Sequence, residues 1–172
     1  GMSAAPSRFF PPAVTADASV LILGSLPGER SLAQQQYYAH PQNQFWRLAG
    51  ELVGADLPML DYQARLSRLN ARGIGLWDVV ASAVRPGSLD QHMRNVEPNP
   101  LAGLISALPE LRAIAFNGAT ASRIGRRELG NAGLADRVAL IDLPSSSPAN
   151  TVAYARKAEA WRALSGWLTA EL

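Results

Sequence analysis

Three consecutive serines at 145–147, which stand between Pro144 and Pro148, have the clearest potential for binding chemistry in this sequence. Hydroxyls and backbone N–H groups just ahead of a helix suit a phosphate, because these donors and the helix dipole favour negative charge. An ordinary polar loop with a serine that caps the next helix has the same composition. The segment therefore supports two interpretations, a phosphate-binding loop and a structural turn.

A second segment, residues 37–46, joins two tyrosines, a histidine and an amide to the start of a hydrophobic helix. A tyrosine ring can stack on a planar ligand, and the Asn43 amide can hydrogen-bond to one. The alternative is structural: Phe45 and Trp46 pack in the core, and Asn43 is a polar residue of the first helical turn. His40, in an Ala-His-Pro turn, is expected to be structural rather than catalytic.

The third segment is a loop, Gly-Ser-Leu-Pro-Gly at 24–28, that follows an apolar run. Glycine lets a backbone approach a ligand closely, although tight turns after strands use the same residues. No Gly-Lys-Ser/Thr follows and the G-x-G-x-x-G pattern is absent, so neither common phosphate motif is present. A small-molecule enzyme that holds a nucleotide phosphate in this loop is one alternative function.

Alternating strands and helices are expected to position these segments. Four apolar runs predict strands at 20–23, 74–80, 113–116 and 138–143. Periodicity and end signals predict helices from about 41, over 62–69, 99–108 and 119–130, and from 151 onward. This alternation is typical of an α/β protein whose mainly parallel sheet is covered on both faces.

No internal repeat or linker divides the chain. Residues 1–19, rich in proline and alanine, are expected to form an irregular N-terminal arm, and residues 20–172 a single domain. Within this domain, residues 82–98 are too long for a simple connection, which makes them a candidate functional loop.

Ligands of parallel α/β sheets bind beyond the carboxyl ends of the strands. At these ends the sequence places the 24–28 loop, Asp78, Asn117 and the serines at 145–147. All four carry polar or glycine-rich chemistry, so we expect them to surround one ligand site.

The composition excludes several classes of protein. The chain has no cysteine and two histidines, which rules out disulfides and thiolate chemistry and leaves little for a transition-metal site. No apolar run approaches the ~20 residues that span a bilayer, and no signal peptide is recognisable, so a cytoplasmic protein is expected. The net charge is +2, with Lys157 as the single lysine among arginines. Arginine suits phosphate, but GC-rich codon usage explains this balance equally well.

Five motifs occur in order: GSLPG at 24–28, YYAHPQNQFW at 37–46, GLWDVVAS at 75–82, FNG at 116–118 and LPSSSPAN at 143–150. Together they resemble the uracil-DNA glycosylase superfamily. The sequence is most similar to the hypoxanthine (deoxyinosine) DNA glycosylase branch, which is related to the mismatch-specific uracil and thymine glycosylases. The resemblance covers roughly residues 20–150. It implies a three-layer α/β/α sandwich around a four-stranded, mainly parallel sheet, with no metal or redox cofactor, and we expect a monomer.

The resemblance also implies an activity, that of a DNA glycosylase of base excision repair. Such an enzyme flips a deaminated base (hypoxanthine, uracil or both) out of DNA and hydrolyses its N-glycosidic bond. Its partner is DNA with a deaminated or mismatched base. Two usual catalytic positions hold leucine here: Leu26, just before the proline of the first motif, and Leu143, just before the last Pro-Ser. A catalytically weak damaged-DNA-binding protein of the same fold is therefore the alternative.

By resemblance, the catalytic candidates are Asn43 and Asp78. Asn43 matches an asparagine of the mismatch-specific and hypoxanthine branches, and would position a water, since an amide takes no proton near neutral pH. Asp78 stands where several relatives have an asparagine that hydrogen-bonds to uracil. Its carboxylate would accept from the N1–H of hypoxanthine; the structural alternative is a bond to a neighbouring backbone amide.

The remaining expected contacts fall into two groups. Those to the base are Ser25, Leu26, Gly28, Asn117 and Tyr38, the last as a stacking ring. Those to the DNA backbone are Ser145, Ser146 and Ser147, with Ala149 and Asn150 where relatives fill the gap left by the flipped base. Arg85, His92 and Arg94, in the long loop, are expected either to meet phosphates or to be solvated.

Overall fold

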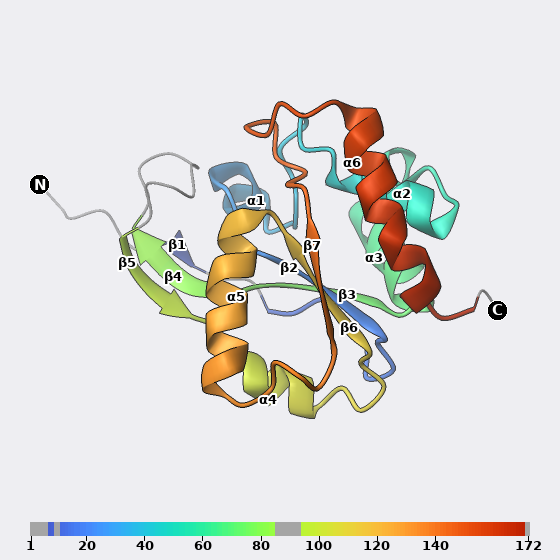
Figure 1. The fold of residues 1–172 in the computed structure, drawn as a ribbon. Coiled ribbons are helices and arrows are strands. Elements are labelled where there is room, and N and C mark those ends of the chain that lie inside the picture. Colours follow the sequence, from blue (N-terminus) through green and yellow to red (C-terminus); the bar gives the residue numbers. More distant parts are fainter. Residues whose placement is uncertain (1–6, 9–10, 85–93, 171–172) are drawn as a thin grey trace, which may run out of the picture.

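The main sheet has four parallel strands in the order β3–β2–β6–β7 (Figure 1). The computed structural model describes residues 7–8, 11–84 and 94–170. The strands are β2 (Val20–Gly24), β3 (Ile74–Asp78), β6 (Ala113–Asn117) and β7 (Ala139–Leu143). The expected α/β fold with a four-stranded parallel sheet is therefore confirmed.

Helices cover both faces of this sheet, since successive side chains of a strand point to opposite sides. Val20 and Ile22 belong to one buried cluster, and Leu21 and Leu23 to the other. The first face carries α2 (Phe45–Val53), α3 (Tyr62–Ala71) and α6 (Tyr154–Trp161), and the second carries α4 (Leu101–Ser106) and α5 (Ala119–Asn131). Figure 1 shows the two groups of helices on either side of the strands.

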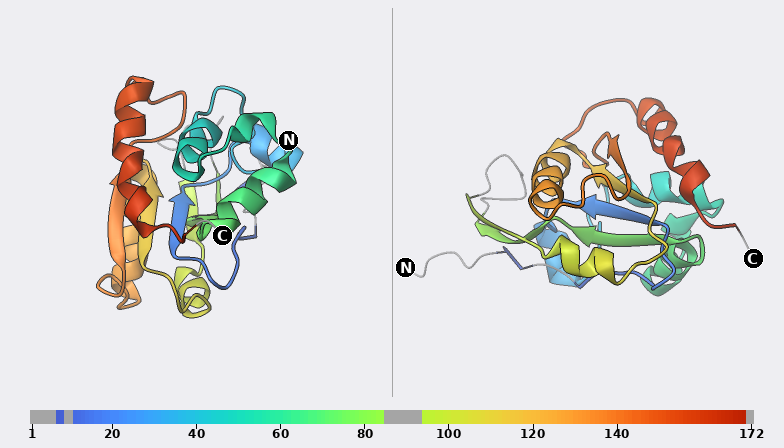
Figure 2. Two further views of the ribbon diagram at one scale, coloured as in Figure 1. Left: turned by 90° about the vertical axis from the view of Figure 1, so that its right-hand side faces the viewer. Right: turned by 60° about the horizontal axis from the view of Figure 1, so that its bottom comes forward.

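A second, smaller sheet corrects the expectation for residues 74–98. It has three antiparallel strands in the order β1–β4–β5, and projects at one side of the molecule (Figures 1 and 2). The strands are β1 (Ser7–Arg8), β4 (Val80–Val84) and β5 (Arg94–Pro98). Both ends of the stretch expected to be an irregular loop are thus strand. Arg94 lies in β5, whereas Arg85 and His92 lie outside the described residues.

The apolar run at 74–80 is two strands rather than one. The chain leaves the main sheet at Val79, whose N–H donates to the carbonyl of Gly24 (2.8 Å), and the Val80 N–H donates to the carbonyl of Ser25 (3.0 Å). The side-chain Nδ2 of buried Asn99 donates to the carbonyls of Asp78 (2.7 Å) and Val80 (3.3 Å). The Asn99 side chain thus satisfies backbone carbonyls that would otherwise bond to a neighbouring strand where the chain passes from β3 to β4. Hydropathy alone does not reveal this change of sheet.

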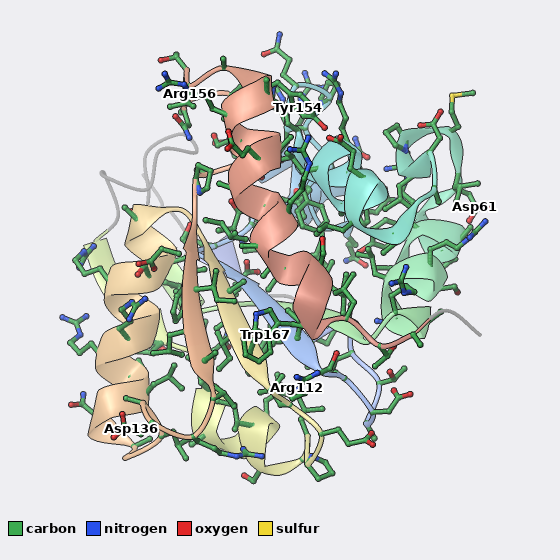
Figure 3. The ribbon with its side chains drawn as sticks, turned by 45° about the vertical axis from the view of Figure 1, so that its right-hand side comes forward. Asp61, Arg112, Asp136, Tyr154, Arg156 and Trp167 are labelled. Carbon is green, nitrogen blue, oxygen red and sulfur yellow. The ribbon has the colours of Figure 1, made fainter. Side chains whose placement is uncertain are left out.

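The first and last segments pack against the sheets more than expected. Within the 1–19 segment, Ser7–Arg8 pairs with β4, and Ala13 forms an antiparallel bridge with Leu76 of β3. Trp167, near the other end of the chain, accepts a hydrogen bond at its carbonyl from the Ser19 hydroxyl (2.8 Å). The guanidinium of Arg112, just before β6, lies 5.1 Å from the Trp167 ring centre (Figure 3). Trp167 thus covers the amino-terminal ends of β2 and β6, which Ser19 and Arg112 directly precede.

Several helix boundaries differ from expectation. α2 begins at Phe45 rather than near Pro41, because a turn at 40–43 precedes it. The last helix begins at Tyr154 and continues as the 3₁₀ helix η3 (Arg162–Trp167). Two short helices were not expected from the sequence, α1 (Glu29–Gln34) and the 3₁₀ helix η1 (Leu57–Met59).

Candidate active site

A cleft of about 670 Å³ lies at the carboxyl ends of the parallel strands. Every residue expected from the sequence to form the site lines it: Ser25, Leu26, Gly28, Tyr38, Asn43, Asp78, Asn117, Ser145, Ser146, Ser147, Ala149 and Asn150. The topology explains this convergence, because all strands of the main sheet end at the same edge.

Asp78, the last residue of β3, is a buried carboxyl at the base of the cleft, with 3% of its surface exposed. Its register partner across β2–β3 is Gly24. A Cβ at position 24 would lie 2.8 Å from Oδ1 of Asp78 and 3.1 Å from Oη of Tyr38. Glycine is therefore needed here for space, and the two side chains come together over its Cα.

Tyr37 and Tyr38 separate into a structural and a cleft-lining residue. Tyr37 is buried, and its hydroxyl donates to the carbonyl of Pro11 (2.9 Å). Burial raises the pKa of Tyr37, and the Asp78 carboxylate raises it further, so the hydroxyl stays protonated. Tyr38 has φ of 54° and stacks on the buried ring of Phe45, with centres 3.9 Å apart and planes 17° apart. Tyr38 therefore stands in the cleft on a rigid aromatic support.

Asn43, Ser146 and Asn117 form a continuous hydrogen-bond network. The Ser146 N–H donates to Oδ1 of Asn117 (2.9 Å), whose Nδ2 donates back to Oγ of Ser146 (2.9 Å). The Ser146 hydroxyl then donates to Oδ1 of Asn43 (2.8 Å), which also accepts from the N–H of Phe45 (2.9 Å). A backbone N–H can only donate, so its contact identifies the oxygen of each amide.

These directions define what Asn43 can offer a ligand. An amide oxygen has two acceptor sites, and Oδ1 of Asn43 uses both within the protein. Its NH₂ group is the part with capacity for a bond in the cleft. Asn43 is thus oriented as a hydrogen-bond donor.

The position of Ser146 corrects one expectation. Ser146 was expected to contact a DNA phosphate, but it has 0% exposed surface and its hydroxyl both donates and accepts within the network. Its carbonyl also accepts from the Gln44 N–H (3.0 Å). Ser146 is a buried connector between α2 and the 144–150 loop. Asn117 is likewise engaged with Ser146 through both its amide atoms, and so supports the site from β6.

Ser145 and Ser147 are arranged differently. Oγ of Ser145 accepts from the Ser147 N–H (3.1 Å), and Oγ of Ser147 accepts from the Ala149 N–H (3.2 Å). Both side chains are only partly buried. Since each oxygen takes a backbone donor, each hydroxyl hydrogen remains to donate, as an anion requires.

The two leucines at the usual catalytic positions belong to the interior. Leu26 is 6% exposed and Leu143 is 4% exposed, and each is part of a buried apolar cluster. His40 is exposed, and its Nδ1 accepts from the Gln42 N–H (3.1 Å), a local turn contact. Leu26 and Leu143 therefore supply no acid–base group, and His40, which also lines the cleft, uses its Nδ1 in a turn.

Two supporting residues were missed from the sequence. Asn99 fixes the backbone on both sides of Val79, directly after Asp78, and Lys157 holds the 144–150 loop from behind. A signal existed only for Lys157: it lies between Tyr154, Ala158 and Trp161, the apolar stripe of the last helix. A lysine at such a core-facing position is unusual and indicates a specific partner.

Metal-binding and membrane-spanning features are absent from the part of the chain that the structure describes. No group of three or more His, Cys, Asp or Glu side chains within the ranges 7–8, 11–84 and 94–170 could hold a metal ion. Over the same residues, no helix combines the length and apolar character needed to cross a membrane.

The fold and cleft define an α/β protein whose ligand site lies at the strand ends, beside a loop that presents hydroxyl donors. The chain belongs to the uracil DNA glycosylase superfamily, whose family model matches residues 11–165. It is accordingly a monofunctional DNA glycosylase, a hydrolase of N-glycosyl bonds, and its substrate is DNA. The enzyme class expected from the five motifs is confirmed.

Individual relatives agree with this assignment. A hypoxanthine DNA glycosylase of Methanosarcina acetivorans is 40% identical over 159 residues, which cover 91% of this chain and 96% of that protein. A hypoxanthine DNA glycosylase of Methanosarcina barkeri is 44% identical over 109 residues, covering 63% of this chain and 69% of the relative. The solution NMR structure of a candidate uracil DNA glycosylase from Methanosarcina acetivorans is similar with a TM-score of 0.81 and 38% identity, over 93% of this chain and 96% of that one.

Proposed function

We propose that this enzyme releases hypoxanthine from DNA by hydrolysing the N-glycosidic bond of a flipped deoxyinosine. The observation that carries the proposal is the cleft in which a buried carboxyl (Asp78), an aromatic ring (Tyr38) and an oriented amide donor (Asn43) occur together. The two relatives named hypoxanthine DNA glycosylase, at 40% and 44% identity, support the choice of base.

Asp78 is the group that selects the base. Hypoxanthine carries a proton on N1, which a carboxylate accepts, whereas adenine has a lone pair there that the carboxylate repels. A buried polar contact left unmade costs about 1–3 kcal/mol, or roughly ten- to hundredfold in selectivity. Uracil also presents a ring N–H beside a carbonyl, so the same contact admits it. Tyr38 stacks on the flipped base with the ring face that Phe45 does not cover.

Asn43 contributes a hydrogen bond at the reacting end. Because Oδ1 is occupied by Phe45 and Ser146, its NH₂ group donates either to the oxygen of the attacking water or to the departing base. Either bond holds a reactant in place without any proton transfer by the amide. The first of these is the water-positioning role that the sequence suggested for Asn43.

The bond-breaking step separates charge. The C1′–N9 bond breaks with its electron pair passing to the base, while water oxygen bonds to C1′ and releases a proton. DNA phosphates stabilise the cationic sugar, and donors to the base stabilise the anion. The proton released by the water passes to the departing base anion through solvent, so that neutral hypoxanthine leaves.

The 144–150 loop binds the DNA backbone on either side of the flipped nucleotide. Ser145 and Ser147 donate their hydroxyl hydrogens to phosphate oxygens, consistent with the backbone N–H bonds that their own oxygens accept. Ala149 and Asn150, at the rim of the same loop, occupy the gap that the flipped base leaves. Ser146 does not contact phosphate in this proposal; its hydroxyl instead holds Asn43 in position.

Residues 20–172 form the functional unit in this proposal, and the enzyme acts as a monomer in the cytoplasm. The support for one functional unit is that residues from Gly24 to Asn150 line a single cleft. Light scattering after size-exclusion chromatography measures the mass in solution, and a dimer that is inactive on dilution would contradict the monomer.

A base-release assay under single-turnover conditions tests the activity. The substrates are duplexes with one deoxyinosine, one deoxyuridine or one mismatched thymine, and an undamaged duplex is the control. Release of hypoxanthine at the highest rate supports the proposal. Fast release of uracil or thymine with no hypoxanthine contradicts the base choice, and binding without release of any base contradicts the mechanism.

A further inference from the structure

Lys157, the only lysine of the chain, is a buried ammonium directly behind the 144–150 loop. It is 1% exposed, although it lies in the first half of α6, where the loop enters the helix. Nζ donates to Oε1 of Gln44 (2.9 Å), the carbonyl of Asn150 (2.9 Å) and the carbonyl of Ser147 (3.4 Å). All three ammonium hydrogens thus have an acceptor, and the lysine ties α6, the loop and the start of α2 together.

The charge of Lys157 has no counter-charge in these contacts. All three acceptors are neutral oxygens, and no carboxylate bonds to Nζ within the residues that the structure describes. Burial lowers the pKa of Lys157, as expected for a cation that is removed from water without an anion beside it. Keeping an unpaired ammonium inside a protein is unfavourable unless some other interaction uses its charge.

Most of the carbonyl oxygens of the loop in front of Lys157 accept hydrogen bonds from protein donors. The Leu143 carbonyl accepts from Gly118 N–H, and the Pro144 carbonyl accepts from Nε1 of Trp161 (3.0 Å). The carbonyls of Ser145, Ser146, Ser147 and Asn150 are likewise bonded to protein donors. Lys157 donates to the last two, and the Ser147 carbonyl also accepts from the Asn150 N–H (3.0 Å). The negative ends of these peptide dipoles are therefore satisfied by donors of the loop itself or of the protein behind it, while the hydroxyls of Ser145 and Ser147 remain available to an anion.

We propose that Lys157 is a positioning residue for DNA, a buried cation that holds the 144–150 loop in its phosphate-binding form and has the DNA backbone as its counter-charge. This rests on the proposed function of the loop. The lysine does not touch DNA: it acts through the loop carbonyls and through the electric field that it adds at the loop surface.

Two substitutions separate charge from scaffolding. Lys157→Met removes both the ammonium and its three hydrogen bonds. Gln44→Glu keeps the ammonium and its acceptor at position 44, but places a carboxylate against Nζ and neutralises the field. The probe is a fluorescent duplex with one deoxyinosine and its undamaged counterpart, bound at several salt concentrations, with thermal unfolding of each variant measured alongside.

Both variants are expected to bind both duplexes roughly tenfold more weakly than the parent at low salt. The slope of log affinity against log salt should become shallower by up to about one unit. Gln44→Glu should unfold at the temperature of the parent protein or above it. If Lys157→Met does not fold, Gln44→Glu decides alone.

Two controls change the same net charge far from the cleft. Arg68→Met and Gln63→Glu alter exposed side chains of α3, and should leave affinity within about twofold. The proposal is overturned if Gln44→Glu binds DNA like the parent, which makes Lys157 a scaffold only, or if the α3 controls weaken binding equally. A protein that releases no hypoxanthine but shows the expected binding pattern would instead contradict the proposed function alone.

Discussion

Gly24 and Asp78 face each other across the parallel β2–β3 pair, so closely that a single methyl group on Gly24 would reach the carboxylate. The backbone of Gly24 is in strand conformation and needs no positive φ. Its missing side chain is what matters, because the space above its Cα is filled by Oδ1 of Asp78 and Oη of Tyr38. The glycine therefore determines where two residues of the cleft stand.

Gly24→Ala should accordingly reduce base release without unfolding the protein. The added Cβ would lie 2.8 Å from Oδ1 of Asp78 and 3.1 Å from Oη of Tyr38, so both side chains must move. We expect single-turnover release at least roughly tenfold slower, with about 1–3 kcal/mol lost in the free energy of unfolding. Gly103→Ala on α4 is the matched control, since its Cβ meets nothing within 4 Å. Full activity of Gly24→Ala would show that this placement is not needed.

The donor role of Asn43 leads to a second prediction. Asn43→Asp preserves the oxygen that accepts from Phe45 and Ser146, but replaces the NH₂ donor by a second acceptor. We expect release to slow roughly hundredfold, as when a single transition-state donor is removed. Asn43→Ala should slow release similarly while binding of damaged duplex stays nearly intact. Single-turnover base release measures the rate, and duplex binding measures the affinity. An Asn43→Asp enzyme faster than the parent would assign this position to proton transfer instead.

The cleft could be predicted from the sequence because its parts are attached to parallel strands. Strand-length apolar runs are readily recognised, and the carboxyl ends of parallel strands meet at one edge. Gly24, Asp78, Asn117 and Ser145 each follow or end such a run. Their meeting in one cleft follows from topology and required no knowledge of side-chain contacts.

What could not be predicted depends on contacts between distant segments. The break at Val79 is stabilised by Asn99, a residue twenty positions further along the chain whose role appears only after folding. The three adjacent serines are equivalent in sequence, yet only Ser146 is buried. Its hydroxyl accepts a hydrogen bond from Asn117 and donates one to Asn43. Periodicity describes which face of an element is buried, and it says nothing about such cross-chain hydrogen bonds.

The different environments of the three serines give a third prediction. Ser146→Ala removes the donor to Asn43 and the acceptor of Asn117, and should lower the free energy of unfolding by about 1–3 kcal/mol. Base release should slow with it, because Asn43 is no longer held. Thermal unfolding and single-turnover rates measure both.

Ser145→Ala and Ser147→Ala should behave in the opposite way. Each removes one donor to DNA, so duplex affinity should fall roughly three- to tenfold, with little change in unfolding. Ser67→Ala on the exposed side of α3 is the control. A Ser146→Ala variant of normal stability and rate would argue against the network, and unchanged affinity in both other variants would argue against phosphate contacts.

Tyr38 gives a fourth prediction, which concerns its ring rather than its hydroxyl. Tyr38→Phe keeps the face that stacks on Phe45 and on the base, whereas Tyr38→Ala loses both. Base stacking on an aromatic side chain is worth about 1–3 kcal/mol. At subsaturating enzyme, the alanine variant should therefore release the base roughly ten- to hundredfold more slowly than the parent, whereas the phenylalanine variant should keep nearly the parental rate. Equal losses in the two variants would instead assign the function to the hydroxyl near Asp78.

The last prediction concerns the choice between hypoxanthine and adenine. If the Asp78 carboxylate accepts from N1–H, then Asp78→Asn offers an NH₂ donor that adenine N1 can accept, and the repulsion of adenine disappears. Selectivity for deoxyinosine over deoxyadenosine should fall roughly ten- to hundredfold, with a smaller general loss of rate. Asp78→Ala should also weaken selectivity, but without gaining the adenine contact, so comparison of the two variants isolates the hydrogen bond from the lost volume. Single-turnover release from paired deoxyinosine and deoxyadenosine duplexes measures the ratio. If Asp78→Asn and Asp78→Ala both abolish release from every substrate while Asn43→Ala has little effect, the carboxylate is the proton acceptor or cation stabiliser, and base choice depends on other contacts in the cleft.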